Sequence, residues 1–299
     1  MKILKVNKPS DYSSYLGVTD MHPLVSVLEY DRISPVYVTL NDYSVYGIFL
    51  RGDDLVDLTY GCGRYDYREG TLLAVAPGQI GGTEDTGEKV DLSGWALLFH
   101  PDLLQGTSLE KGIAKYSFFD YRINEALHMT EEEKEIIIGL MRSIETEIGK
   151  QRDAHQDRII VGYIELMLNF CQRFYDRQFV TRKIDNTNIL SRFHEVLSDY
   201  FSSELQLEHG LPTIQYMADK LCLSSSYLGD IIKRTTGTNA SKYIQRHMIQ
   251  KAKNLLSSGM SISQTAYSLG FDYPQHFSRF FKREEGLTPK EYQSRRKIN

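Results

Sequence analysis

The sequence predicts a protein of two domains, a β-rich N-terminal domain followed by an all-α C-terminal domain. Short runs of β-branched and aromatic residues alternate with turn residues between about residues 24 and 100. From residue 130 onward, apolar residues recur at the spacing of a helix, and the last third contains an internal duplication. The length of 299 residues agrees with two domains of ordinary size.

The N-terminal region contains several short predicted strands. Gly, Asp, Asn and Pro separate these runs, which cover residues 24–30, 36–40, 43–51, 71–76 and 95–100. Many short strands with turns between them favour a sandwich or a barrel. The glycine-rich stretch 78–88 lacks the Gly-Lys-Ser/Thr ending of a phosphate-binding loop, and we interpret it as a hairpin connection.

Two helices are predicted after the strands. Thr130 and Glu133 have the spacing of a capping box, in which each side chain bonds the other residue's backbone amide. An apolar stripe follows, and a second periodic segment covers residues 153–175. Residues 176–188 are mainly polar and show no period, so we place a linker there. The predicted domains are therefore 1–175 and 189–299.

Charge is distributed unevenly along the chain. Residues 1–186 contain 20 Lys and Arg against 29 Asp and Glu, whereas residues 231–299 contain 13 against 4. A basic region behind an acidic one is typical of a module that binds a polyanion. A solvated basic helix face would have the same composition, so charge alone leaves both interpretations open.

Several classes of protein are disfavoured. No apolar run is long enough for a transmembrane helix, and the first residues show no secretory signal. The three cysteines are far apart in the sequence, which fits a reducing cytoplasm. The N-terminal histidines are not paired in sequence, and no nucleophile elbow or Walker loop is present. We therefore expect no membrane span, no metal, no cofactor and no enzyme activity, and we expect His100 and Trp95 to be structural.

The duplication is the most informative feature of the sequence. Ile214, Ala218, Leu221 and Leu223 recur as Ile262, Ala266, Leu269 and Phe271, each 48 residues later. After a predicted turn, seven further positions match at a separation of 49, including Lys233-Arg234 with Lys282-Arg283 and Gly237 with Gly286. Each copy is predicted to be a helix, a tight turn and a second helix, with N-caps at Thr213, Ser224, Ser261 and Asp272. A helix over residues 241–256 separates the copies.

These C-terminal residues resemble the AraC/XylS family of bacterial transcription regulators. The resemblance covers about residues 189–299 and is most specific over residues 261–292, which match the family's C-terminal signature nearly throughout. It implies a DNA-binding domain of seven helices with two helix-turn-helix motifs. Residues 66–77 and 94–101 and the helices after them are similar to the cupin-like sensor and dimerisation domain of many members, which implies a cupin-like β-barrel with packed helices.

The second helix of each copy supplies the predicted DNA-binding residues. Leu228, Ile231 and Ile232, and likewise Phe277, Phe280 and Phe281, are expected to face the core. Gln275 and Arg279 are predicted to read bases, although Arg279 could instead contact phosphate alone. Gly229 and the acidic Asp230 weaken the prediction for the first copy. The full predicted set is Ser225, Ser226, Tyr227, Lys233, Arg234, Gln275, His276, Ser278, Arg279 and Lys282.

Together these features predict a cytoplasmic, nucleoid-associated transcriptional regulator, with double-stranded DNA as its partner. We expect it to act as an activator with RNA polymerase, to form a homodimer and to sense a small-molecule effector through its N-terminal domain. Two alternatives stay open at this stage. One is a cupin-type enzyme with a regulatory DNA-binding tail, and the other is a regulator without a ligand, controlled by abundance or by a protein partner.

Overall fold

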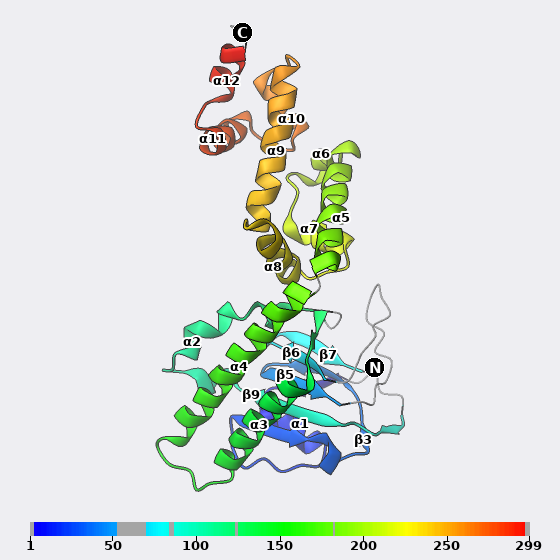
Figure 1. Cartoon of the computed structure of the whole chain (residues 1–299), viewed down its shortest axis with the longest axis vertical. Coiled ribbons are helices and arrows are strands. Elements are labelled where there is room, and N and C mark those ends of the chain that lie inside the picture. The colour runs from blue at the N-terminus through cyan, green and yellow to red at the C-terminus, as the bar shows by residue number, and fades with distance from the viewer. Residues whose placement is uncertain (1–2, 53–69, 84–86, 123–124, 182, 297–299) are drawn as a thin grey trace. The chain divides into compact units, whose positions relative to one another are not determined.

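The computed structural model describes residues 3–52, 70–83, 87–122, 125–181 and 183–296 (Figure 1). The chain forms two compact units, Met1–Thr181 and Arg182–Asn299. The N-terminal unit contains β-sheets and helices, and the described part of the C-terminal unit is helical. Residues 66–69, which contribute to the family resemblance, and Cys62 lie outside the described residues.

The described strands of the N-terminal unit form three sheets. Their pairing is antiparallel except between β1 and β4. The largest sheet has the order β10 (Leu127–His128), β6 (Thr71–Val75), β5 (Tyr46–Arg51), β9 (Gly94–Phe99), β2 (Val25–Glu29). The other two sheets have the orders β1 (Ile3–Val6), β4 (Leu40–Tyr43), β7 (Gln79–Gly82), and β3 (Val36–Tyr37), β8 (Lys89–Val90).

Every predicted strand run contains a strand of the structure, but the glycine-rich stretch differs from its prediction. Part of it is strand β7, which pairs with β4 and places Gly82 opposite Leu40. Gly82 has φ +115°, and a Cβ atom there would lie 2.4 Å from the carbonyl oxygen of Thr39. The glycines therefore permit close approach of two strands. Within the described ranges the strands do not close into a barrel.

Helices α3 (Glu131–Ile148) and α4 (Gln156–Thr181) form the predicted helical pair. The capping box is confirmed, because the hydroxyl of Thr130 accepts from the amide of Glu133 and the Glu133 carboxylate accepts from the amide of Thr130. No irregular linker follows this pair of helices in the described residues, because α4 continues to Thr181. Phe179 is buried, and Gln178 bonds the backbone of Ala126 and His128, so tertiary contacts extend the helix.

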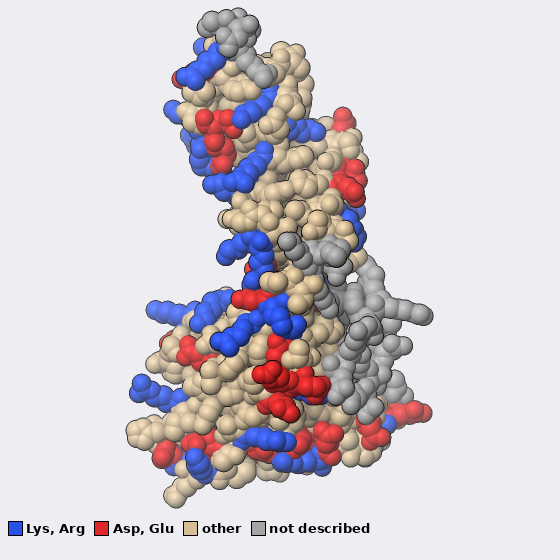
Figure 2. All heavy atoms as spheres, in the orientation of Figure 1, with Lys and Arg blue, Asp and Glu red and all other residues tan. Residues whose placement is uncertain are grey.

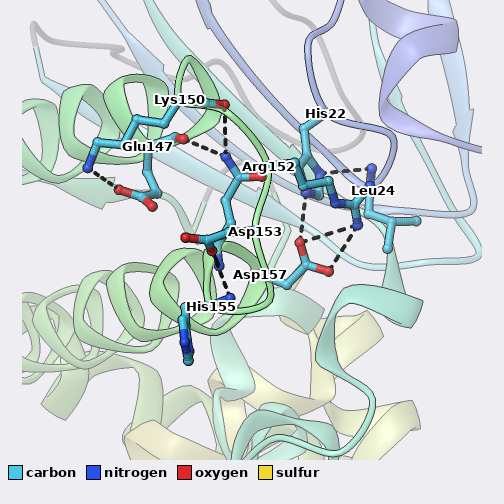
Figure 3. A network of polar contacts seen from close by, with 9 residues as sticks. His22, Leu24, Glu147, Lys150, Arg152, Asp153, His155 and Asp157 are labelled. Carbon is cyan, nitrogen blue, oxygen red and sulfur yellow. Dashed lines mark hydrogen bonds and ion pairs between the residues drawn. The ribbon is translucent and has the colours of Figure 1, made fainter.

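Polar contacts fix the connection between α3 and α4 (Figure 3). The carboxylate of Asp153 accepts from the amides of His155 and Gln156 at 2.8 and 3.0 Å, which begins α4. One turn later, Asp157 lies 2.9 Å from the Nε2 atom of the buried His22, whose Nδ1 atom accepts from the amide of Leu24. The start of α4 is thereby joined to the segment that enters β2.

The remaining short helices that the structure describes in this unit are α1 (Pro9–Tyr15), α2 (Leu109–Gly112) and four 3₁₀ turns. Trp95 is 3% exposed and faces the guanidinium groups of Arg32 and Arg142, so the prediction that it is a core residue is confirmed. His100 accepts from the amide of Asp102 at 3.2 Å, which makes it a structural hydrogen-bonding residue as expected.

The C-terminal unit has eight helices over the residues that the structure describes, one more than the family resemblance implies. A single apolar cluster joins α5 to both copies of the repeat and to the helix between them. No described helix of either unit is long and apolar enough to cross a membrane. The eight helices are α5 (Lys183–Ser202), α6 (Leu205–His209), α7 (Ile214–Lys220), α8 (Ser225–Thr236), α9 (Ala240–Ser257), α10 (Ile262–Ser268), α11 (Pro274–Glu285) and α12 (Pro289–Arg296).

Candidate nucleic-acid interface

The two copies of the repeat fold in the same way. The first helices, α7 and α10, each have seven residues, and the second helices, α8 and α11, each have twelve. Thr213, Ser224 and Ser261 accept hydrogen bonds from backbone amides at the starts of α7, α8 and α10. The duplicated pattern in the sequence is therefore a duplicated pair of helices in space.

One predicted cap is wrong. Asp272 was expected to cap α11, but that helix begins at Pro274 with Tyr273 at the N-cap and has no side-chain cap. Proline at the first helical position has no amide hydrogen to leave unpaired and has a φ angle suited to a helix. The start of α11 therefore depends on Pro274, one residue later than the sequence pattern suggests.

The turns inside the two copies have the same geometry, although different residues form them. The amide of Leu223 donates to the carbonyl of Ala218, and the amide of Phe271 donates to that of Ala266, at 2.9 and 3.0 Å. The residue at the left-handed position is Cys222 in the first turn, with φ 59°, and Gly270 in the second, with φ 87°. Ala218 and Ala266 are fully buried, as their small size requires where two helices meet.

The buried face of each second helix agrees with the prediction. Leu228, Ile231 and Ile232 are fully buried, and Phe277, Phe280 and Phe281 are at most 9% exposed. The rings of Phe277 and Phe281 lie 5.8 Å apart, and Phe271 packs against Phe277 and Phe280. Both helices end at a glycine in the left-handed conformation, Gly237 and Gly286. This packing fixes which side of α8 and α11 reaches solvent.

The predicted residues of α11 face solvent together. Gln275, His276, Arg279 and Lys282 are exposed, and Ser278 is half-buried with its hydroxyl donating to the carbonyl of Pro274 at 2.9 Å. The exposed side of α11 thus presents an amide, an imidazole and two cations within two helical turns. Such groups can bond base edges and phosphates of a duplex.

The predicted residues of α8 are less uniform. Lys233 and Arg234 are exposed, whereas Ser225 and Ser226 are half-buried, and the hydroxyl of Ser225 donates to the Gln215 side chain at 2.7 Å. Tyr227 is only 5% exposed, so the expectation that its side chain faces outward is wrong. It lies four residues before Ile231 and therefore shares the buried face of the helix.

A groove brings α11 and α9 together. His276, Arg279 and Arg283 line it with Ser241 and Gln245, in a volume of about 580 Å³. Arg283 was not predicted as a site residue, although the repeat indicates it, because it matches Arg234 in the first copy. Figure 2 shows Lys and Arg side chains gathered over the part of this unit that holds α11 and α12, with a few acidic residues among them.

No group of three His, Cys, Asp or Glu side chains suited to a metal ion occurs among the residues described. The outward side chains of α8 and α11 offer hydrogen bonding and charge.

Comparison with known proteins agrees with this geometry. Residues 217–295 match a protein family described as a helix-turn-helix domain. A transcriptional regulatory protein of Bacillus subtilis, YesN, is 28% identical over 127 residues, 40% of this chain and 32% of that protein. The transcriptional activator RhaS of Escherichia fergusonii is 34% identical over 96 residues, 32% of either chain. This chain thus spans about a third of the length of these relatives.

Among solved structures, a DNA-binding transcriptional dual regulator from Escherichia coli K-12 is similar over 36% of this chain and 94% of that one, with 27% identity and a TM-score of 0.31. The matching family and relatives are regulators of transcription and not enzymes. The family match lies within the C-terminal unit. The C-terminal unit of this chain is therefore an AraC-type helix-turn-helix domain, the domain that these transcriptional regulators share.

Proposed function

We propose that the chain is a transcriptional regulator that binds double-stranded DNA through its two helix-turn-helix motifs. One observation carries the proposal: the exposed side of α11 presents Gln275, His276, Arg279 and Lys282 while three phenylalanines hold its other side in the core. The second helix of such a motif enters the major groove, and its outward side chains meet bases and phosphates.

Each exposed residue has a role that follows from its donor pattern. Gln275 can donate to and accept from an adenine edge, and Arg279 can donate twice to guanine, whereas Lys282 is suited to phosphate. In the first motif, Ser225, Ser226, Lys233 and Arg234 supply the contacts, mostly to the backbone. Asp230 is half-buried on α8, and a carboxylate there repels phosphate, so the first motif contributes less to base recognition.

The N-terminal unit is proposed to be a cupin-like domain that senses a small molecule and joins two copies of the chain. A cavity of about 280 Å³ within this unit supports the sensing role. Binding of an effector would favour one arrangement of the paired DNA-binding units, and the dimer would then activate transcription with RNA polymerase in the cytoplasm. The described helices, none of which could span a membrane, are compatible with this location.

A mobility-shift assay with DNA from upstream of the chain's own gene tests the proposal. Arg279→Ala is expected to weaken specific binding by about 1–3 kcal/mol if Arg279 reads a base. Lys282→Ala should weaken binding to all sequences alike and reduce the dependence of affinity on salt. Arg192→Ala, which removes an exposed arginine of α5 outside both motifs, is the matched control and should bind as the wild type does.

The base-reading role of Arg279 has its own test. If Arg279→Ala changes the salt dependence and leaves the preference among operator sequences intact, Arg279 contacts phosphate only. If neither α11 variant differs from the Arg192→Ala control, the proposed interface is wrong.

A further inference from the structure

The cavity of the N-terminal unit has mainly aromatic and aliphatic walls, with a few polar and charged side chains among them. It lies among β4, β5, β6 and β7 and the segment that follows α2, and its volume is about 280 Å³. That is close to the lower end, roughly 300 Å³, of cavities that hold small ligands. Tyr12, Tyr37, Tyr43, Phe49 and Phe118 supply aromatic surface. The occupant that fits these walls is a small molecule with an apolar or aromatic body.

A buried amide oxygen points to a hydrogen-bond donor on that occupant. Asn41 lines the cavity and is 4% exposed. Its Nδ2 atom donates to the carbonyls of Thr39 and Gly81 at 3.0 and 3.4 Å, which determines the orientation of the amide. Its Oδ1 atom is buried and accepts no hydrogen bond from any residue that the structure describes. An unsatisfied buried acceptor destabilises the folded state, and a donor on a ligand would remove that cost.

A partly buried guanidinium points to a negative charge on the same occupant. Arg51 ends β5 and lines the cavity, and its Nε atom is buried without a partner among the described residues. Among the described residues no carboxylate forms an ion pair with it, and its Cζ atom lies 6.0 Å from the centre of the Tyr30 ring. Arginine keeps its charge at all physiological pH values, and a buried charge is stable only when it is paired.

The tyrosines around Arg51 do not supply the missing charge. Burial raises the pKa of Tyr30 and of Tyr43 well above its usual value, and the positive charge of Arg51 only partly opposes this. The hydroxyls of Tyr12 and Tyr30 bond one another at 2.7 Å. At neutral pH these phenols are therefore uncharged, and none of them supplies an anion to the guanidinium.

We propose that this cavity binds a small organic carboxylate that also carries a hydroxyl group and an apolar or aromatic body. The carboxylate pairs with Arg51, the hydroxyl donates to the Oδ1 atom of Asn41, and the body packs against the aromatic walls. The inference rests on the proposed sensing role of the N-terminal unit and names its ligand class. Asp120 and Arg122 also line the cavity, so its charged side chains sum to one positive charge, which favours a monoanion over a dianion such as phosphate.

Matched probes test each of these contacts on the full chain. We choose mandelate, 3-phenyllactate and 2-hydroxyoctanoate, each with its primary amide and with the acid that lacks the hydroxyl. Isothermal titration calorimetry should show at least one hydroxy acid binding tenfold or more tightly than its amide, because the amide cannot pair with Arg51. The deoxy acid should bind more weakly than the hydroxy acid, which tests Asn41 without altering the strand.

Two variants complete the experiment. Arg51→Gln should lower affinity for the hydroxy acid at least tenfold, whereas Arg173→Gln, an exposed arginine of α4 outside the cavity, should leave it unchanged. Fluorescence of Trp95, the chain's single tryptophan, shows whether each variant keeps the N-terminal unit folded. The inference is overturned if no hydroxy acid binds, if amides bind equally well, or if folded Arg51→Gln binds as the wild type does.

A mobility shift run on the same samples separates this inference from the proposed function. If the hydroxy acids fail but the chain still shifts its DNA, the ligand class is wrong and DNA binding stands. If a hydroxy acid binds and no DNA is shifted, the cavity assignment stands and the proposed regulator does not.

Discussion

Replacing Gly270 with alanine should destabilise the C-terminal unit more than any comparable glycine substitution in it. Gly270 lies in the turn between α10 and α11 with φ +87°, a conformation that costs an alanine about 1–2 kcal/mol. An added Cβ would lie 2.8 Å from the carbonyl oxygen of Gln206 and 3.0 Å from that of Gly210. Both are backbone atoms, so α6 and the loop after it would have to shift.

The magnitude follows from these two costs. Inserting a carbon into well-packed surroundings costs about 1–3 kcal/mol, and the reduced freedom of the unfolded chain returns about 0.4–1 kcal/mol. The expected loss in free energy of unfolding is therefore about 2–4 kcal/mol. Gly237→Ala is the control, because Gly237 has φ +69° but no heavy atom lies within 4 Å of its added Cβ. It should cost only about 1 kcal/mol.

Urea unfolding followed by far-ultraviolet circular dichroism measures the loss. Trp95 lies in the N-terminal unit, so the midpoint of its fluorescence transition should be unchanged in both variants. The variant should also bind DNA less tightly, since the turn sets the position of α11. If Gly270→Ala is no less stable than Gly237→Ala, the contact with Gln206 and Gly210 does not hold the turn and the reasoning is wrong.

Three further outcomes are expected. Thr130→Ala should lower the stability of the N-terminal unit by about 1 kcal/mol by removing the cap of α3, while Thr130→Ser should not, as Trp95 fluorescence in urea would show. Phe277→Ala should destabilise the C-terminal unit by about 3–5 kcal/mol in the same dichroism assay, and a loss below that of Gly237→Ala would contradict its core position. Burial raises the pKa of the Cys171 thiol from 9.0 to about 12. Between these pH values only the unfolded thiol ionises, so stability should fall there as pH rises, and less steeply in Cys171→Ala.

The sequence predicted the C-terminal unit in detail because its signals are local. Spacing of Phe277, Phe280 and Phe281 gave the buried side of α11, and Thr213, Ser224 and Ser261 marked three helix starts. The outward residues of α11 follow from the same period. A prediction of this kind needs no knowledge of other parts of the chain.

The errors arose where two neighbouring signals compete. Asp272 is a good cap residue, but Pro274 fits the first helical position and moves the start of α11. Tyr227 has a polar end that suggests the surface, yet the helical period places it four residues from Ile231. For Tyr227 the helical period contained the answer, and for α11 the proline two residues after Asp272 did.

The cavity was not predicted, because it depends on which strands are neighbours. Strand alternation does place Arg51 on the same side as Phe49, and Asn41 on the same side as Tyr43. Only the pairing of β4 with β7 and of β5 with β6 brings these sides around one space. An arginine in phase with buried aromatics along a strand is the signal that could have found it.

The helix that joins the two motifs fixes the distance between the two sites that the unit can contact on a DNA duplex. Its 18 residues correspond to a rod of about 27 Å. The apolar cluster holds α8 and α11 to that rod, and Lys253 of α9 pairs with Glu285 of α11 at 2.6 Å. A rod cannot stretch to follow a longer target. If half a helical turn of DNA is inserted between the two subsites of an operator, the unit should therefore bind only one of them, even when each subsite has the preferred sequence.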